Sequence, residues 1–201
     1  VIKENKIIEV DRSGLIAAYV GQTALKTDEI INNSLNGILF IDEAYTLKRS
    51  DSSNDYGQEA IDILLKRMED YRDQLIIIVA GYKKEMENFI ESNPGLKSRF
   101  NKYFDFVDYK PEELVKIYEK LTGSSGFVIE EEALTKVSEL FSALHSKKND
   151  RFGNARLVRN VFEKTFQRQA NRTSEVEIIT KEILITIKAE DIPLSEFTTL
   201  N

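Results

Sequence analysis

Short apolar runs, separated by stretches with helical spacing, dominate the first half of the chain. Lys6–Val10, Ile38–Ile41 and Leu75–Ala80 each predict a short strand. The third run is apolar throughout, which is typical of strands that are covered on both faces in a parallel sheet. Tyr103–Val107 alternates in the manner of a strand, so it predicts a further strand.

Apolar residues recur with helical spacing between these strands and through the rest of the chain. The expected helices are Thr23–Leu35, Gln58–Asp70, Lys83–Ile90, Pro111–Leu121, Glu130–Ser146 and Asn154–Arg172. Ser13 is expected to cap a short helix after the first strand, and Asn93–Gly95 is expected to form a turn. The polar stretch Lys48–Gly57 predicts a surface loop.

The pattern changes near Tyr109–Pro111, after which it is helical. Strands that alternate with helices predict an α/β fold with a parallel sheet. We therefore expect an α/β core over residues 1–108, a small helical lid over 109–175 and a C-terminal extension over 176–201. The extension is rich in Ile and Glu, and its pattern fits either a β-hairpin or a strand followed by a short helix.

Composition removes several classes of function. The 201 residues include no cysteine and one histidine, which excludes disulfides and thiolate metal sites and argues against a zinc site. The formal charge of −6 disfavours nucleic acid as the main partner. Neither an apolar run of membrane-spanning length nor a signal peptide is present. The sequence therefore predicts a soluble, cytoplasmic protein that does not use a membrane.

The strand over Ile38–Ile41 ends in two adjacent carboxylates, Asp42 and Glu43, which is the form of a Walker B element. In open α/β folds the carboxyl edge of the sheet is where nucleotide phosphates bind. Asp42 is expected to hold Mg²⁺, and Glu43 is expected to polarise the attacking water. The alternative is that these acids cap the next helix. The lysine-containing phosphate loop is absent, because none of the nine glycines is followed by lysine.

Several further short motifs follow one another along the chain. They are Val10–Ser13, Tyr19–Thr23, Phe40–Tyr45, Ala80–Tyr82, Ser92–Gly95, Ser98–Phe100 and Gly153–Arg156. As a set they resemble the AAA+ ATPases, in the group that contains red-type rubisco activase (CbbX) and stage V sporulation protein K. The resemblance runs from about residue 9 to residue 172, and it implies a P-loop-type parallel sheet followed by a small helical lid.

The resemblance implies roles for four residues beyond the Walker B pair. Arg99 corresponds to the arginine finger that reaches a neighbouring subunit, although a basic surface patch is the alternative. Arg156 corresponds to sensor 2, which contacts the γ-phosphate of the same subunit, with Arg159 as the second choice. An exposed helix start capped by Asn154 is the alternative there. Tyr82 stands at sensor 1, where many members have Asn, and stacking of this tyrosine at the strand end is equally compatible.

Tyr19, Val20 and Gly21 resemble the aromatic–aliphatic–Gly pore loop that grips a polypeptide in the central channel of the ring. An aromatic side chain can insert between substrate side chains without reading their sequence, and Gly lets the loop bend. The alternative is a helix C-terminus that is capped by Gly, with Tyr19 packed on the core.

The family fold places a strand and its phosphate-binding loop before the segment where this chain begins. In that order the strand lies in the middle of the sheet, between the strands that end at Ala80 and Val107. A sheet without a central strand has unpaired backbone groups and uncovered apolar surface, so a stable monomer of this chain alone is not expected. We expect that Val1 is not the natural start, or that a second chain supplies the strand.

The resemblance implies a ring-forming homo-oligomer, expected to be a hexamer, that binds ATP and Mg²⁺ and remodels a protein substrate through a central pore. Nucleic acid is not an expected partner. The alternative is a degenerate, non-hydrolysing module that oligomerises or binds a partner. The retained acids and arginines favour the ATPase, because a binding scaffold has no need of them. Roles in rubisco activation, sporulation and secretion all fit the sequence.

Overall fold

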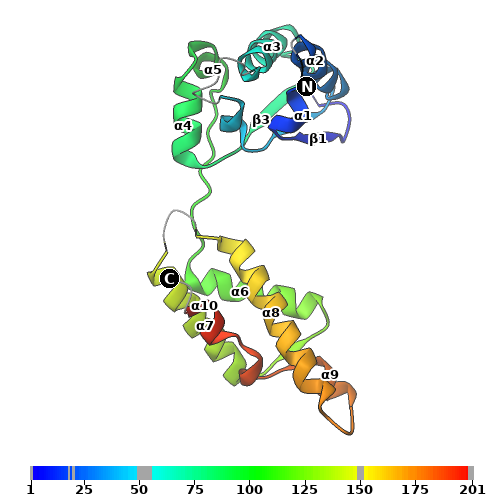
Figure 1. The fold of residues 1–201 in the computed structure, drawn as a ribbon, viewed down its shortest axis with the longest axis vertical. Helices are drawn as coiled ribbons and strands as arrows, with labels where there is room; N and C mark the ends of the chain where they lie inside the picture. Colours follow the sequence, from blue (N-terminus) through cyan, green and yellow to red (C-terminus); the bar gives the residue numbers. More distant parts are fainter. Residues whose placement is uncertain (1, 18, 20, 49–55, 149–151, 199–201) are drawn as a thin grey trace. The chain divides into compact units, whose positions relative to one another are not determined.

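A computed structural model of the chain describes residues 2–17, 19, 21–48, 56–148 and 152–198 (Figure 1). The chain divides into two compact units, residues 1–105 and residues 106–201. We call them unit 1 and unit 2. Each unit has its own hydrophobic core.

Unit 1 is built on a parallel sheet. Its described strands lie in the order β1 (Ile7–Val10), β2 (Ile38–Ile41) and β3 (Ile76–Val79). The register pairs Val10 with Ile41 and Ile41 with Val79, so the three strands end at one edge of the sheet. Leu39 and Ile41 of the central strand are fully buried. The predicted parallel sheet is therefore confirmed, and the residues after β2 lie at its carboxyl edge.

Helices cover this sheet. They are α1 (Arg12–Leu15), α2 (Gln22–Asn33), the 3₁₀-helix η1 (Ala44–Leu47), α3 (Gly57–Asp70), α4 (Lys83–Glu91) and α5 (Pro94–Arg99). The buried residues Ile31 of α2 and Leu64 of α3 belong to the same core as Leu39 of β2. The helices expected in this region form close to their predicted bounds.

Two predicted local features of unit 1 are wrong. Ser13 does not cap α1; the Asp11 side chain does, and it accepts hydrogen bonds from the N–H groups of Ser13 (2.8 Å) and Gly14 (3.2 Å). The expected turn at Asn93–Gly95 is the start of α5. Asn93 accepts from the Gly95 N–H at 2.8 Å, and Pro94 fits the first helical turn because its φ is fixed.

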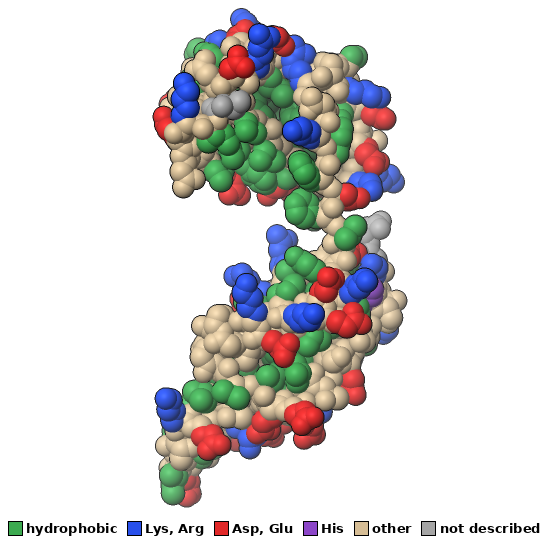
Figure 2. All heavy atoms as spheres, turned by 180° about the vertical axis from the view of Figure 1, so that it is seen from behind, with side chains coloured by type: hydrophobic (Ala, Val, Ile, Leu, Met, Phe, Trp, Pro, Cys, Tyr) green, Lys and Arg blue, Asp and Glu red, His purple; other side chains and the backbone are tan. Residues whose placement is uncertain are grey.

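The strand predicted at Tyr103–Val107 does not form. Residues 101–110 have no regular secondary structure, and Phe104 and Phe106 are 82% and 93% exposed. A strand needs a neighbour to pair its backbone groups, and no described strand lies beside the outer edge of β3. Ile78 of β3 is 42% exposed, and hydrophobic side chains gather on one face of unit 1 (Figure 2).

Unit 2 is helical apart from one short pair of strands. Its elements are α6 (Pro111–Ser124), β4 (Val128–Ile129), α7 (Glu131–Ser146), α8 (Asn154–Ser174), α9 (Lys181–Ile185), β5 (Thr186–Ile187), the 3₁₀-helix η2 (Ala189–Asp191) and α10 (Leu194–Thr198). The core joins residues of α6, α7 and α8, among them Leu114, Phe141 and Val158. No helix in the described part of the chain is long and apolar enough to cross a membrane.

The C-terminal segment packs into the core of unit 2. It forms no β-hairpin: β5 pairs in parallel with β4, and η2 and α10 follow it. Ile187 and Ile192 are buried there. Arg172 of α8 holds the segment through two 2.9 Å contacts with the buried carboxylate of Asp191, which is 1% exposed. A bidentate pair of this kind is strong and directional.

Tyr118 of α6 is fully buried between the rings of Phe141 and Phe162. Its hydroxyl has no hydrogen-bond partner in the described residues. The neighbouring Thr165 hydroxyl donates to the carbonyl of Val161 at 2.8 Å. Burial raises the pKa of Tyr118 to about 12, so the phenol stays neutral at physiological pH.

We expect Tyr118→Phe to leave the free energy of unfolding unchanged or to raise it by up to about 1 kcal/mol, because it removes an unsatisfied buried polar group. Urea unfolding of the protein and its variant measures the change. A loss of more than about 2 kcal/mol would show that the hydroxyl has a partner in solution.

Candidate functional site

The two carboxylates predicted to carry the chemistry follow β2 at the carboxyl edge of the sheet. The Asp42 N–H donates to the Val10 carbonyl at 2.8 Å, and the Ala44 N–H donates to the Ala80 carbonyl at 3.0 Å. These bonds fix the backbone between the ends of β1 and β3. Asp42 and Glu43 are both exposed.

Glu43 has an uncommon backbone conformation. Its φ is 46°, in the left-handed region, and its N–H donates to Oδ1 of Asp42 at 2.9 Å. Non-glycine residues in this region are strained, and such residues cluster at functional sites. The turn sends the chain into η1 directly after the two acids.

A hollow of about 450 Å³ lies beside Glu43. Its walls are Asp11, Arg12, Ser13, Ile16, Ala17, Glu43 and Thr46, from α1 and the segment after β2. Hydrogen bonds from the Ser13 hydroxyl and the Gly14 N–H lower the pKa of Asp11, so this acid is charged in the hollow. No motif in the sequence predicts that α1 faces Glu43.

Tyr82, the predicted sensor 1 residue, follows β3 and is 59% exposed. Its ring lies 6.4 Å from the ring of Tyr45, two residues after Glu43. Partial burial, reinforced by the negative charge of Glu43, raises the pKa of Tyr45. Gly81 permits this approach, because a Cβ at that position would lie 2.7 Å from Cδ1 of Tyr45. Tyr82 therefore lies near the acids, with Tyr45 as its neighbour.

Arg99, the predicted finger, ends α5. Its guanidinium lies 3.7 Å from Oε2 of Glu69, and a 3.5 Å contact joins it to the Ser98 hydroxyl. Its Nε is buried without a hydrogen-bond partner among the described residues. Neither Asp42 nor Glu43 is among these partners. Within one chain the structure thus leaves Arg99 with an unsatisfied donor.

The predicted pore loop is only partly described. Tyr19 is 70% exposed, which excludes the alternative in which it packs on the core. Val20 lies outside the described residues. Gly21 has a φ of 76° and occupies the cap position before α2, where a side chain would strain the backbone.

Arg156 and Arg159, the predicted sensor 2 residues, lie exposed on the first turns of α8 in unit 2. Asn154 begins this helix with a φ of 46°. Its side chain accepts from the Tyr109 N–H at 2.9 Å and donates to Oδ1 of Asp108 at 2.5 Å. The Asn154 amide and Lys148 lower the pKa of Asp108. Asn154 therefore ties the segment before α6 to the helix start.

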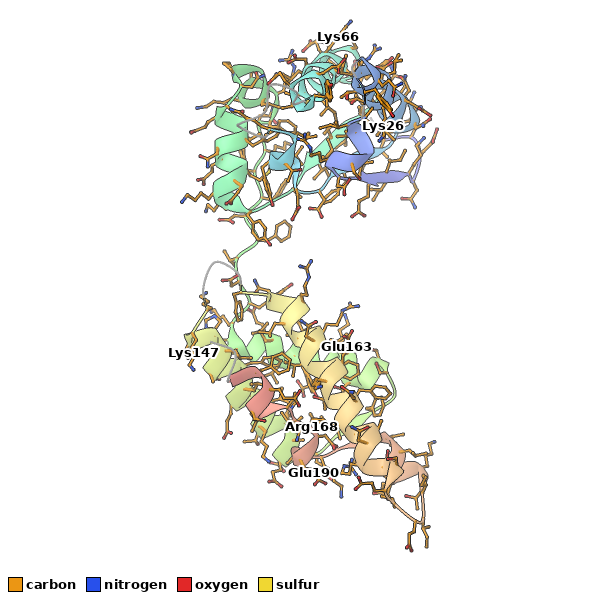
Figure 3. The ribbon with its side chains drawn as sticks, viewed as in Figure 1. Lys26, Lys66, Lys147, Glu163, Arg168 and Glu190 are labelled. Atoms are coloured by element: carbon orange, nitrogen blue, oxygen red, sulfur yellow. The ribbon has the colours of Figure 1, made fainter. Side chains whose placement is uncertain are left out.

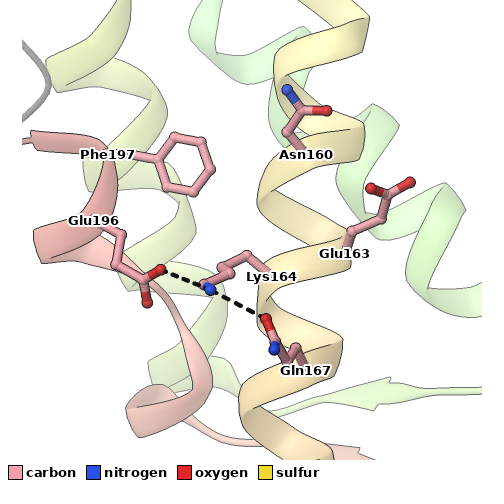
Figure 4. Close-up of a pocket in the computed structure, with 6 residues that line it drawn as sticks. All are labelled: Asn160, Glu163, Lys164, Gln167, Glu196 and Phe197. Atoms are coloured by element: carbon pink, nitrogen blue, oxygen red, sulfur yellow. Dashed lines mark hydrogen bonds and ion pairs between the residues drawn. The ribbon is translucent and has the colours of Figure 1, made fainter.

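A second hollow, of about 420 Å³, lies between α8 and α10 (Figure 4). It is lined by Asn160, Glu163, Lys164, Gln167, Glu196 and Phe197. Lys164 pairs there with Glu196 at 3.1 Å and with Gln167 at 3.0 Å. None of the predicted site residues lines it, so we do not assign the nucleotide chemistry to this hollow.

The donor set at the sheet edge fits magnesium better than zinc. In the described part of the chain, no three His, Cys, Asp or Glu side chains gather into a metal cluster. Mg²⁺ needs only one or two carboxylates, because water and phosphate oxygens complete its shell. The exposed Asp42 meets this requirement.

Comparison with known proteins agrees with this geometry. Residues 2–107 match the ATPase family associated with various cellular activities (AAA). This chain belongs to the AAA family. Residues 110–200 match the AAA lid domain. The expected fold, a AAA+ parallel sheet followed by a helical lid, is therefore confirmed.

Relatives with known names are similar along almost the whole chain. Protein CfxQ homolog of Trieres chinensis is 43% identical, over 95% of this chain and 66% of the relative. Stage V sporulation protein K of Bacillus subtilis is 41% identical, over 98% and 61%. Ribulose bisphosphate carboxylase/oxygenase activase of Cyanidioschyzon merolae, which is chloroplastic, is 44% identical, over 95% and 65%. The chain thus spans slightly less than two thirds of these relatives.

Solved structures with low sequence identity share the AAA fold. The crystal structure of the FIGL-1 AAA domain matches with a TM-score of 0.64 and 17% identity, over 94% of this chain and 60% of that one. A Thermotoga maritima RuvB mutant matches with a TM-score of 0.61 and 14% identity, over 92% and 50%. At these identities the likeness concerns the fold alone.

Proposed function

We propose that this chain is the core of a AAA+ ATPase that couples ATP hydrolysis in a ring, expected to be a hexamer, to the remodelling of a protein substrate in the cytoplasm. The observation that carries the proposal is the pair Asp42 and Glu43. Both acids are exposed at the carboxyl edge of a parallel sheet and are held between the ends of its neighbouring strands. This is where open α/β folds bind nucleotide phosphates.

The two acids have separate roles in this proposal. Asp42 would hold Mg²⁺, which supplies positive charge against the phosphates. Glu43 accepts a hydrogen bond from the attacking water and polarises it. Its carboxylate is suited to this role because it is exposed and borders a hollow of about 450 Å³. Tyr82, whose ring lies 6.4 Å from that of Tyr45, would donate its hydroxyl as sensor 1 in this proposal.

Arginines complete the proposed site. The Arg99 side chain is 32% exposed, and its guanidinium makes long contacts with Glu69, at 3.7 Å, and with Ser98, at 3.5 Å. This supports a role outside its own subunit, because the outer nitrogens of the charged fork remain able to bind an anion on a neighbour. In a ring the γ-phosphate of the neighbouring subunit is that anion. Arg156, with Arg159 one turn later, would contact the γ-phosphate bound to its own subunit from the lid.

In this proposal the phosphate-binding loop is supplied from outside the 201 residues, because no glycine in them precedes a lysine. The proposal assigns it to a further segment of the natural protein or to a second chain. The activity therefore belongs to the complete protein, and each functional experiment uses that protein.

The exposed Tyr19 supports a pore loop formed by Tyr19, Val20 and Gly21. We expect Tyr19→Ala in the full-length protein to keep ATP affinity within about twofold, because the residue does not touch the nucleotide site. The same change should abolish the ATP-dependent unfolding of a bound polypeptide. Fluorescent nucleotide titration and a polypeptide-unfolding assay measure the two effects.

Leu25→Ala is the matched control for Tyr19→Ala, because Leu25 is a comparably exposed apolar residue on α2, at 73%. Full unfolding activity of the Tyr19 variant would remove the pore-loop assignment. A complete protein that binds no ATP would remove the proposed function itself and favour the non-hydrolysing alternative.

A further inference from the structure

In the sequence and in space, helix α1 connects two residues with separate proposed roles. Glu43 is proposed to activate water for ATP hydrolysis, and Tyr19 is proposed to grip the polypeptide substrate. The helix begins one residue after the cap Asp11 and leads to Tyr19. It also forms a wall of the hollow that Glu43 borders. A helix of four residues has few backbone hydrogen bonds of its own. Side chains from neighbouring elements therefore determine its position.

Arg12 joins α1 to the backbone that follows Glu43. Its Nη1 donates to the carbonyl oxygens of Thr46 and of Leu47, the latter at 3.2 Å. The Thr46 N–H in turn donates to the Glu43 carbonyl at 2.8 Å. One residue, Thr46, thus links the Arg12 guanidinium to the backbone of Glu43. Charged donors make stronger bonds to carbonyls than neutral donors do.

The other side of α1 is held to α2. Lys26 of α2 is labelled in Figure 3. It donates to the carbonyl oxygens of Ser13 at 2.6 Å and Ile16 at 3.1 Å. The Thr27 hydroxyl donates to the Leu15 carbonyl at 3.0 Å. The Ala17 N–H donates to the Thr23 hydroxyl at 3.1 Å. Tyr19 therefore lies on a segment whose two ends are both held by hydrogen bonds.

We propose that Arg12 is a positioning residue that couples Glu43 to Tyr19. The inference rests on the proposed function, and it adds the route by which the nucleotide site moves the pore loop. A displacement of η1 after Glu43 pulls α1 through Arg12, and Tyr19 follows because it lies four residues after the end of α1 at Leu15. Arg suits this position because its long, always charged side chain carries several donors on a rigid fork.

The test uses the full-length protein with Arg12→Met, which keeps the length of the side chain and removes the donors. Arg12→Lys keeps a charged donor, and Arg72→Met is a control on an arginine whose side chain is 72% exposed. Hydrogen exchange is measured with and without the non-hydrolysable analogue AMP-PNP, over residues 13–23 and 44–48. ATP hydrolysis is measured in parallel.

We expect AMP-PNP to change exchange in both segments of the unaltered protein. In Arg12→Met the response of residues 44–48 persists, whereas the response of residues 13–23 falls to less than about half, with kcat lowered about tenfold and KM for ATP within about twofold. Arg12→Lys restores much of the response at residues 13–23, and Arg72→Met behaves as the unaltered protein.

An unchanged response of residues 13–23 in Arg12→Met would overturn the proposal. Faster exchange throughout unit 1 before nucleotide is added would also overturn it, because Arg12 would then be a purely structural residue. If the unaltered protein neither binds AMP-PNP nor hydrolyses ATP, the proposed function fails instead. The two failures are therefore distinguishable.

Discussion

Replacing Glu43 with Gln in the full-length protein is expected to lower kcat for ATP hydrolysis by about 10²–10⁴-fold while ATP binding persists. Glutamine has nearly the same shape, so the hydrogen bond between the residue 43 N–H and Asp42, at 2.9 Å, can be kept. It has no negative charge and cannot accept the proton of the attacking water. Steady-state hydrolysis and isothermal titration with ATP separate the two effects.

Glu29→Gln is the matched control for Glu43→Gln, because Glu29 is an exposed acid on α2 away from the sheet edge. We expect the control to hydrolyse ATP at the rate of the unaltered protein. Undiminished hydrolysis by Glu43→Gln would remove Glu43 from the catalytic role. It would leave its left-handed backbone, with a φ of 46°, as a purely structural feature.

Arg99→Ala is expected to lower kcat by about 10³-fold or more, the usual effect of losing an arginine finger, and to keep ATP affinity. The ion pair with Glu69, at 3.7 Å, lies at the surface. Its loss should therefore lower the free energy of unfolding only slightly. Arg99→Lys should recover only part of the rate, because an ammonium group lacks the planar fork that matches a phosphate.

Lys97→Ala tests whether the neighbouring cation shares the work of Arg99. Lys97 is exposed on the same short helix, and we expect its removal to change kcat by less than about threefold, since it has no preformed fork for phosphate. A large loss with Lys97→Ala and a small loss with Arg99→Ala would exchange the two assignments.

The sequence identified the elements whose pattern is set by local chemistry. The apolar runs at Ile38–Ile41 and Leu75–Ala80 gave β2 and β3, because strands buried in a parallel sheet need apolar residues throughout. The spacing of Gln58–Asp70 gave α3, whose buried face includes Ile61 and Leu64. The acids after β2 were located by the same pattern, since they follow the run directly.

Features that depend on distant neighbours were not visible in the sequence. Tyr103–Val107 has the alternation of a strand, but the strand forms only where a partner pairs its backbone, and the described residues contain none beside β3. In the alternative to the sensor 2 assignment, Asn154 caps its helix. Gly153 is the cap residue instead, and the Asn154 side chain reaches Asp108 and Tyr109, which are 46 and 45 residues away along the chain.

The candidate site shows the same division. Asp42 and Glu43 could be predicted because two acids after a buried strand are a local signal. The positions of Arg12 and Gly81 could not, because their roles depend on contacts with Thr46 and Tyr45 across the fold. A Gly before Tyr82 does not by itself predict a close contact. The need for Gly81 follows from the Tyr45 ring, which leaves no room for a Cβ at this position.

The central claim is that one catalytic site takes Glu43 from one subunit and Arg99 from the next. Mixing full-length Glu43→Gln and Arg99→Ala subunits in equal amounts, under conditions that let rings exchange subunits, tests it directly. Each variant alone should be nearly inactive. In a randomly mixed ring about a quarter of the interfaces bring an intact Glu43 against an intact Arg99, so about a quarter of the ATPase rate should return. A mixture no more active than its parts would contradict the shared site.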